Sequence, residues 1–363
     1  MMESFGESMF KHAFQGRKIT VLGASGFVGR WVARRLTAEG ADLQLVVRNA
    51  ADAREIFSIW GVEGKVMEAD LSASGAAGEV IGAGKPELLF NLAGYGVDPG
   101  EREQQDPALA EKLNASLVEE VATACSRLSP SRWPGQRLIH AGSALEYGLI
   151  KGEASEDRKP LPTTLYGRTK LEGTRNLTRV ALATGLPAAT ARLFQVVGPG
   201  EHAGRLLPSL LETARPGSQA VLRLSGGAQK LDFSYVEDIA EGLLKLALCK
   251  PAKLNGPGEI QPGAVINLAS GTMFSVKEFV ERSCKILGLA SHRMRFDADL
   301  KSTSPMQYSR VNIATLILLL RWKPDAKIED IVRRSVRFAE KLNTADLTDR
   351  VPMMEEAISG IRS

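Results

Sequence analysis

Apolar runs and amphipathic segments alternate along the first half of the chain, from Arg17 to about Leu193. Residues 18–22 (KITVL) form a largely apolar run, which favours a buried parallel strand. Residues 27–40 follow with apolar positions at helical spacing. Strands and helices that alternate in this way predict an α/β fold built on a doubly wound parallel sheet.

Three glycines fall at the bend between the first strand and the first helix. Gly23 permits a tight turn, Gly26 lets backbone N–H groups approach a pyrophosphate, and Gly29 lets helix and strand pack closely. A glycine pattern alone is weak, but here a strand precedes it and a helix follows it, as a Rossmann-type dinucleotide site requires. The residues between the glycines that we expect at the cofactor are Ser25, Phe27 and Val28.

The end of the second strand indicates which dinucleotide binds, because a carboxylate there bonds the ribose hydroxyls and a guanidinium pairs with a 2′-phosphate. Arg48 and Asn49 stand at this position, and no acidic residue occupies the strand end itself. We therefore predict NADP(H) in preference to NAD(H). The alternative is that Arg48 is an ordinary solvated charge.

Two further strand ends are expected to face the cofactor, and the alternative for both is a plain turn. We expect Asp70 and Leu71 beside the adenine. Beside the ribose and nicotinamide we expect Leu92, Ala93 and Gly94.

Tyr166 and Lys170 are four residues apart in YGRTK, which puts both on one face of a helix. A phenol ionises near pH 10, and a neighbouring ammonium lowers that pKa by favouring the phenolate. Ser143, at the end of an apolar run, offers a hydroxyl to the oxygen of a substrate. Each residue alone is usually structural, but their order after the glycine loop predicts hydride transfer at a carbinol or ketone.

These motifs together resemble the extended short-chain dehydrogenase/reductase family, in its branch of nucleotide-sugar epimerases, dehydratases and reductases. The resemblance runs from Arg17 to about Ala339 and includes RLFQVVGPGE, LDFSYVEDIA and VINLASG. It implies that Tyr166 is the acid/base, Lys170 its partner and a ribose ligand, and Ser143 a second donor to the reacting oxygen. It also implies cofactor contacts from Asn114, Phe194 and Val196 and substrate contacts from Ser143 and Gln195. We add Ala144, Arg205 and Lys230 as expected substrate contacts at positions where this chain departs from the family.

Departures from the family pattern narrow the reaction. Dehydratases of this branch resemble one another in an acidic pair directly after the Ser143 position, where this chain has Ala144 and Leu145, so dehydration is disfavoured. The string GSALEYG, which contains Glu146, resembles reductases of 4-keto-6-deoxy sugar nucleotides. A Glu at this position is more often a structural hydrogen-bond acceptor than a catalytic acid. Leu231 stands where the family commonly has an Arg for the substrate pyrophosphate. Charges that could replace that Arg are Lys230, Arg205, Arg223 and Arg295.

We therefore predict an NADP(H)-dependent reductase of a nucleotide-activated keto sugar, with carbon 4 favoured. The alternatives are an NAD(P)-dependent nucleotide-sugar 4-epimerase, a reductase of a small carbonyl without a nucleotide, and an NADP-binding regulator without activity. A dimer of identical subunits, formed through two helices, is implied by the resemblance.

Domain boundaries follow from the same pattern. We expect an N-terminal extension (residues 1–16), which is either disordered or a small interface segment, and a nucleotide-binding domain (17–193) to which residues 231–270 return. The smaller, discontinuous substrate-binding lobe comprises residues 194–230 and 271–345, and residues 346–363 are a tail.

Composition adds exclusions. A net charge of +4 with scattered Lys and Arg does not indicate nucleic acid, and the apolar stretch at residues 314–320 is too short to span a bilayer. The three cysteines and four histidines have no disulfide or metal-ligand spacing, and the first sixteen residues do not resemble a signal peptide. These features predict a cytoplasmic enzyme without a metal.

Overall fold

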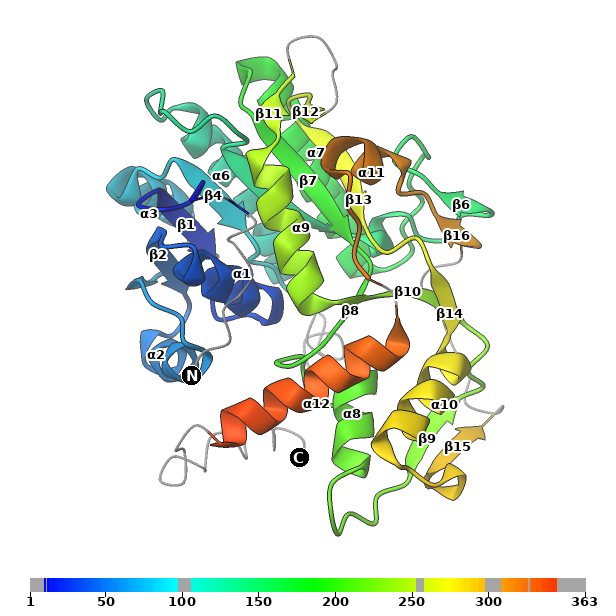
Figure 1. Ribbon diagram of the computed structural model, residues 1–363. Helices are drawn as coiled ribbons and strands as arrows, with labels where there is room; N and C mark the ends of the chain where they lie inside the picture. Colours follow the sequence, from blue (N-terminus) through cyan, green and yellow to red (C-terminus); the bar gives the residue numbers. More distant parts are fainter. Residues whose placement is uncertain are drawn as a thin grey trace.

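The structure is a computed structural model that describes residues 10, 12–96, 106–252, 258–297, 308–325 and 327–344 (Figure 1). Its centre is a seven-stranded parallel sheet in the order β13-β7-β5-β4-β1-β2-β3. The strands are β1 (Lys18–Leu22), β2 (Asp42–Val47), β3 (Lys65–Glu68), β4 (Leu88–Asn91), β5 (Leu138–Ser143), β7 (Ala188–Leu193) and β13 (Ala264–Leu268). The doubly wound parallel sheet predicted from the alternating pattern is confirmed.

Helices cover both faces of this sheet, and each face has its own apolar core. One core is shared with α1 (Phe27–Ala38), α2 (Ala50–Trp60), α9 (Val236–Leu248) and α11 (Ala314–Leu320). The other core is shared with α3 (Ala76–Gly84), α6 (Leu117–Ser126) and α7 (Leu165–Thr184). A short helix α5 (Pro107–Glu111) and one π-helical turn, η1 (Lys112–Ser116), lead into α6.

A smaller lobe lies beyond the carboxyl ends of the strands, around a third apolar core (Figure 1). Its three-stranded sheet has the order β14-β10-β8, from β14 (Met273–Ser275), β10 (Lys230–Tyr235) and β8 (Gln195–Val197). Around it lie α8 (Leu206–Thr213), α10 (Val276–Leu287), α12 (Ile328–Thr344), and the pair β9 (Leu222–Ser225) and β15 (Met294–Asp297). The remaining short elements are η2 (Ala144–Glu146), η3 (Ser291–Arg293), the pair β6 (Glu153–Ala154) and β16 (Arg310–Val311), and the pair β11 (Lys250–Pro251) and β12 (Glu259–Ile260).

The division between the two parts differs from the expected boundaries in two places. β10 pairs with β8 and β14 of the lobe, so residues 231–270 rejoin the central sheet only from α9 onward. Conversely, α11 packs against β13 and α9, because Ile313 and Leu316 belong to the core of the large sheet. Residues 308–320, expected in the lobe, therefore extend the nucleotide-binding domain. The tail expected at residues 346–363 lies outside the described residues.

The described part of the N-terminal extension packs into the nucleotide-binding domain. Phe14 is completely buried and stacks on Trp133 at 5.5 Å, and Phe10 lies edge-on to Phe14 at 5.3 Å. The guanidinium of Arg35 on α1 lies 5.2 Å from the Phe10 ring. Hydrophobic burial of two aromatic rings holds this segment in place, in contrast to the disordered alternative.

The far end of the chain also returns to the nucleotide-binding domain. Phe338 of α12 lies 4.8 Å from the rings of both Trp31 on α1 and Trp60 on α2. Trp31 Nε1 donates a hydrogen bond of 2.9 Å to Pro199 O, in the segment after β8. The helix that follows the glycine loop is thereby joined to both segments of the lobe.

Candidate active site

The glycine loop between β1 and α1 leaves no room for a side chain at Gly23 or Gly29. A Cβ on Gly23, which has φ +72°, would lie 2.8 Å from Ala93 N after β4, and a Cβ on Gly29 would lie 2.1 Å from Gly23 O. Gly26 is the N-cap of α1, and no side chain caps that helix end. The cradle, with the N–H groups of Ser25, Phe27 and Val28 at its helix N-terminus, fits a dinucleotide pyrophosphate.

Arg48 lies exposed immediately after β2, next to Asp70 after β3. Two hydrogen bonds from Ser72, at 2.9 and 2.7 Å, and to a smaller degree the charge of Arg48 lower the pKa of Asp70. The Asn49 side chain caps α2 by accepting hydrogen bonds from Ala51 N and Asp52 N. The Asn49 side chain is therefore occupied by the helix cap. Arg48 is the one of these two residues whose side chain is open to a cofactor phosphate.

An acidic residue that sequence reasoning did not select lies beside this strand end. Glu68 is the last residue of β3, in register with Val47 of β2, and its Oε2 accepts a hydrogen bond of 2.8 Å from Ala50 N. The sequence carries no local signal for this residue. Glu68 comes close to Arg48 only because β3 pairs with β2, and that pairing cannot be read from the sequence. A carboxylate and a guanidinium therefore flank the region where an adenosine ribose would lie.

Asn114 and Lys170 converge on the turn after β4. Asn114 lies in the π-helical turn η1, is fully buried, accepts a 2.9 Å hydrogen bond from Tyr95 N and donates one to Tyr95 O at 2.9 Å and one to Thr169 Oγ1 at 3.0 Å. A Cβ on Gly94 would lie 3.0 Å from Asn114 Oδ1 and 3.9 Å from Lys170 Nζ. Asn114 thus fixes the turn by backbone hydrogen bonds rather than presenting a free amide.

The three residues expected at the reaction centre come from β5 and α7, which contact each other, and Ser143 is the last residue of β5. Tyr166 and Lys170 are on the first turns of α7, which Thr164 caps by accepting a 2.9 Å hydrogen bond from Gly167 N. Tyr166 is half-buried, and a Cβ on Gly96 would lie 3.2 Å from its ring. Burial lowers the pKa of Lys170 to about 8, against an opposing effect of the Glu146 carboxylate. A lysine pKa lowered by burial in this way is common at functional sites.

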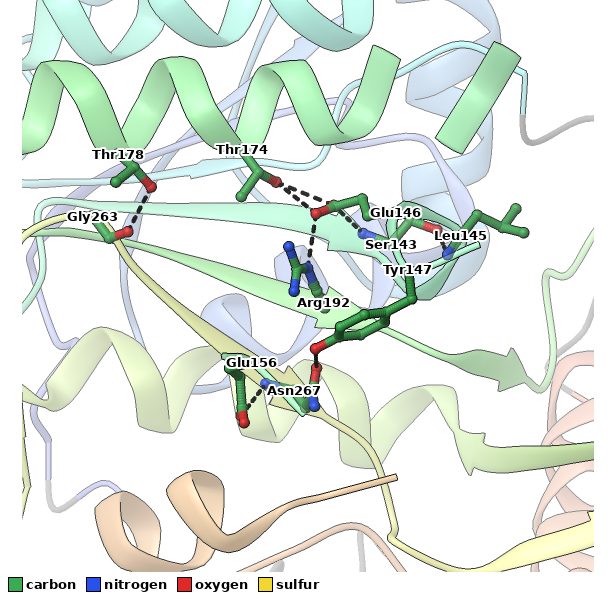
Figure 2. A network of polar contacts seen from close by, with 10 residues as sticks. All are labelled: Ser143, Leu145, Glu146, Tyr147, Glu156, Thr174, Thr178, Arg192, Gly263 and Asn267. Carbon is green, nitrogen blue, oxygen red and sulfur yellow. Dashed lines mark hydrogen bonds and ion pairs between the residues drawn. The ribbon is translucent and has the colours of Figure 1, made fainter. Parts of the chain in front are cut away.

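Glu146 holds the segment after Ser143 in place, as Figure 2 shows. Its Oε1 accepts a 2.8 Å hydrogen bond from Ser143 N, and Thr174 of α7 donates to both carboxylate oxygens at 3.1 Å. Arg192 Nε of β7 donates to its Oε2 at 2.8 Å, with both side chains almost fully buried. Glu146 therefore acts as the structural acceptor that its position indicated.

Tyr147 directly follows η2, and Figure 2 shows its side chain reaching past Arg192 to Asn267 of β13. Its hydroxyl donates a 2.7 Å hydrogen bond to Asn267 Oδ1, and the Arg192 guanidinium lies 4.5 Å from its ring. Burial raises the pKa of the Tyr147 phenol, so this tyrosine stays protonated and structural. Phe194 packs against it and against Tyr308, at 6.3 and 5.7 Å between ring centroids.

The expected substrate contacts come from several separate elements. Gln195 is half-buried on β8, as is Val196, which we expect at the nicotinamide. Ala144 is 2% exposed and belongs to the core, so its side chain is not open to a substrate. Arg205 binds Glu201, with Nε 3.3 Å from Oε1, and burial raises the pKa of that carboxyl to about 7. Lys230 is exposed at the start of β10.

Leu231, at the position where an Arg is common in the family, is buried in the lobe core opposite Phe274 of β14. It therefore contributes to packing, and any charge for a substrate phosphate comes from elsewhere. Among the described residues no group of three His, Cys, Asp or Glu is arranged to hold a metal ion. Within the same residues we find no helix with the length and hydropathy needed to cross a bilayer.

Comparisons with known proteins agree with this geometry. Residues 19–272 match the model of the NAD dependent epimerase/dehydratase family. The chain is 25% identical over 326 residues to dTDP-6-deoxy-L-talose 4-dehydrogenase (NAD(P)(+)) of Kitasatospora kifunensis, covering 87% of this chain and 93% of that protein. It is 28% identical over 280 residues to UDP-glucose 4-epimerase of Corynebacterium glutamicum, covering 75% and 80%.

A similar solved structure is that of UDP-glucuronic acid 4-epimerase from Bacillus cereus in complex with UDP-glucuronic acid and NAD. It has a TM-score of 0.70 and 22% identity, covering 89% of this chain and 99% of that chain. This likeness shows the fold. The matched family model and the dinucleotide cradle together identify an NAD(P)-dependent enzyme that binds a nicotinamide cofactor. The chain therefore belongs to the NAD dependent epimerase/dehydratase family, in the extended short-chain dehydrogenase/reductase superfamily.

Proposed function

We propose that the protein is an NADP(H)-dependent reductase of a nucleotide-activated keto sugar, acting at carbon 4. The arrangement that supports this proposal is Ser143 at the carboxyl end of β5, with Tyr166 and Lys170 on the first turns of α7, a helix that contacts β5 and η2. The curated relative from Kitasatospora kifunensis, a 4-dehydrogenase of a 6-deoxy sugar nucleotide, supports the choice of reaction.

In the proposed mechanism, each residue handles a proton or a hydrogen bond at the keto oxygen. A hydride for the carbon is the chemistry that a bound nicotinamide supplies. Ser143 donates a hydrogen bond to the oxygen, and Tyr166 transfers its phenolic proton to it as the alkoxide forms. The buried ammonium of Lys170 stabilises the resulting phenolate. Glu146 holds Ser143 in position through its backbone N–H.

The first experiment is NADPH oxidation with a panel of dTDP- and UDP-linked 4-keto-6-deoxy sugars. We expect Tyr166→Phe to lower kcat by about 100-fold or more, the loss that is usual for a general acid. Tyr147→Phe is the matched control, because its buried hydroxyl bonds the structural residue Asn267 and interacts with Arg192 of the buried ion pair. Full activity of Tyr166→Phe would overturn the assignment of the acid.

Arg48 supports NADP(H) in preference to NAD(H) within this proposal. Its guanidinium is exposed at the end of β2, where a 2′-phosphate would lie. We expect Arg48→Ser to raise the KM for NADPH about tenfold and leave the KM for NADH nearly unchanged, because one charge-assisted contact contributes about 1.4 kcal/mol or more. Equal effects on both cofactors would refute the preference.

A nucleotide-sugar 4-epimerase is the second candidate, and Glu68 favours it. Its carboxylate lies at the end of β3 beside Arg48, where an acid can bond the ribose hydroxyls of NAD. An epimerase transfers the hydride away and back, so it needs no net turnover of cofactor. Dinucleotide that copurifies with the protein and does not exchange with added NADPH would decide for this candidate.

We include a homodimer and a cytoplasmic location in the proposal. Both rest on the resemblance to the family. Analytical ultracentrifugation of the full chain at micromolar concentration tests the dimer, and a single monomeric species would contradict it.

A further inference from the structure

A row of buried polar side chains crosses the central sheet directly below α7. Asn91, His140 and Thr190 lie on the neighbouring strands β4, β5 and β7, paired in register as Asn91 with His140 and His140 with Thr190. All three are 0% exposed. This is an unusual place for polar groups, since the centre of a parallel sheet is normally apolar on both faces.

The three side chains share one face of the sheet, the face that α6 and α7 cover. Leu89, Leu138 and Ala188 stand two positions earlier on the same strands and belong to the core that these helices close. Because strand residues two apart point to the same side, the polar row lies under α7. Lys170 is on that helix, and its positive charge, after burial, helps to lower the pKa of His140 far below the ordinary value.

Within the described residues, several polar side-chain atoms of this row have no protein partner at hydrogen-bond geometry. They are Oδ1 and Nδ2 of Asn91, Nδ1 and Nε2 of His140, Oγ1 of Thr190 and, in the adjoining ion pair, Nη1 of Arg192. The backbone of Asn91 still acts on the His140 imidazole as a hydrogen-bond partner and raises its pKa, so one ring nitrogen is left for water. A Cβ on Gly142 would lie 2.7 Å from both Thr190 Cγ2 and Glu146 Oε1, so the row adjoins the Glu146–Arg192 pair.

Buried donors and acceptors of this kind are nearly always satisfied in folded proteins, by protein groups or by ordered water. Each buried water typically has about three polar partners, and the row offers both donors and acceptors to several. We propose that Asn91, His140 and Thr190 form an internal water-binding site beneath Lys170, in which His140 is a positioning residue for the Lys170 ammonium. Water held there accepts hydrogen bonds from the ammonium and favours its charged form.

The charged and titratable groups around Lys170 are few. Glu146 on η2, with its partner Arg192 on β7, lies on one side and His140 on β5 lies beneath, while Tyr95 and Tyr166 lie in the adjacent turn and one helical turn away. The imidazole is neutral, so it offers one donor and one acceptor. It therefore connects water to Lys170 without adding a charge.

The water site itself is tested by Thr190→Val, which keeps the shape of the side chain and removes the hydroxyl. If the row holds water, the variant loses a hydrogen bond and its Tm falls by about 2 °C or more. If the row is dry, removal of an unpaired hydroxyl leaves the Tm equal or raises it, and the proposal is overturned. This measurement needs no substrate.

The link to Lys170 rests on the proposed function and is tested by the pH dependence of kcat/KM. We expect His140→Phe to shift the alkaline limb about one pH unit lower, because the ammonium of the coupled Tyr166–Lys170 pair loses a hydrogen-bonding neighbour. His140→Gln, which keeps both a donor and an acceptor, should restore the limb. Ile139→Val, the buried neighbour on the opposite face, is the control for a general loss of packing.

An unchanged limb in His140→Phe, or an equal shift in Ile139→Val, would overturn the positioning role while the proposed function stands. If His140→Phe does not fold, the alkaline limb of kcat/KM is measured in Thr190→Val instead. An unchanged limb in that variant would likewise overturn the positioning role. Absence of turnover in the wild-type protein would count against the proposed function, and the Tm of Thr190→Val would still decide the water site.

Discussion

Replacement of Glu146 by Leu should destabilise the protein as strongly as the loss of a large side chain from the core. The carboxylate is 0% exposed and accepts hydrogen bonds from Ser143 N, Thr174 Oγ1 and Arg192 Nε. Without it, the guanidinium of Arg192, 4% exposed, remains buried and uncompensated. Breaking a buried ion pair in this way costs about 3–5 kcal/mol, a large part of the 5–15 kcal/mol that is typical of a whole domain.

The assay is urea denaturation followed by circular dichroism, with the free energy of unfolding compared between variants. The double variant E146L/R192L should be more stable than E146L, because it removes the stranded charge together with its partner. The same substitution frees the Ser143 segment, so kcat should fall as well. A loss below about 1 kcal/mol in E146L, or simple additivity in the double variant, would refute this reasoning.

Three further predictions concern the loop, the N-terminal segment and the lysine. Gly29→Ala should raise the Kd for the dinucleotide at least tenfold by fluorescence titration, because its Cβ would lie 2.1 Å from a backbone oxygen; Gly82→Ala, with nothing within 4 Å, is the control and should bind normally. Phe14→Ala should lose about 3–5 kcal/mol of stability in urea, as a fully buried ring does, and Leu182→Ala, 67% exposed, should lose little; equal losses would contradict the packing. Lys170→Met should be more stable than wild type at pH 7, since the folded pKa of about 8 lies below the 10.5 of the free side chain and burial of the charge is unfavourable below pH 8. The difference should shrink as the pH rises from 8 toward 10.5, and a constant difference in urea experiments across that range would disprove the origin of the effect.

The parallel sheet, its glycine loop and the family could be predicted from the sequence because each of them carries its own local signal. Gly23, Gly26 and Gly29 are needed for close backbone approach, and that need is visible in the residues themselves. Tyr166 and Lys170 are paired by helical spacing alone. Local patterns of this kind can be recognised in the sequence without knowledge of tertiary contacts.

Other features depended on contacts between distant segments. Glu68 lies beside Arg48 only because β3 pairs with β2 in one particular register. Phe14 is buried because it stacks on Trp133, far away in the chain, and its own segment has no periodic pattern. His140 could be assigned to a buried strand, but the row of polar side chains around it depends on the residues of both neighbouring strands.

The junction at Phe338 brings two of the four tryptophans of the chain, Trp31 and Trp60, under one aromatic ring from the last described helix. Because Trp31 also binds the backbone after β8, any motion that separates the lobe from the glycine loop alters the environment of both indoles. Intrinsic fluorescence is therefore a label-free signal for movement of the lobe relative to the glycine loop. The same packing connects α12 to the nucleotide-binding domain. A chain that ends before residue 338 would therefore lose a contact that supports α1, the helix after the glycine loop.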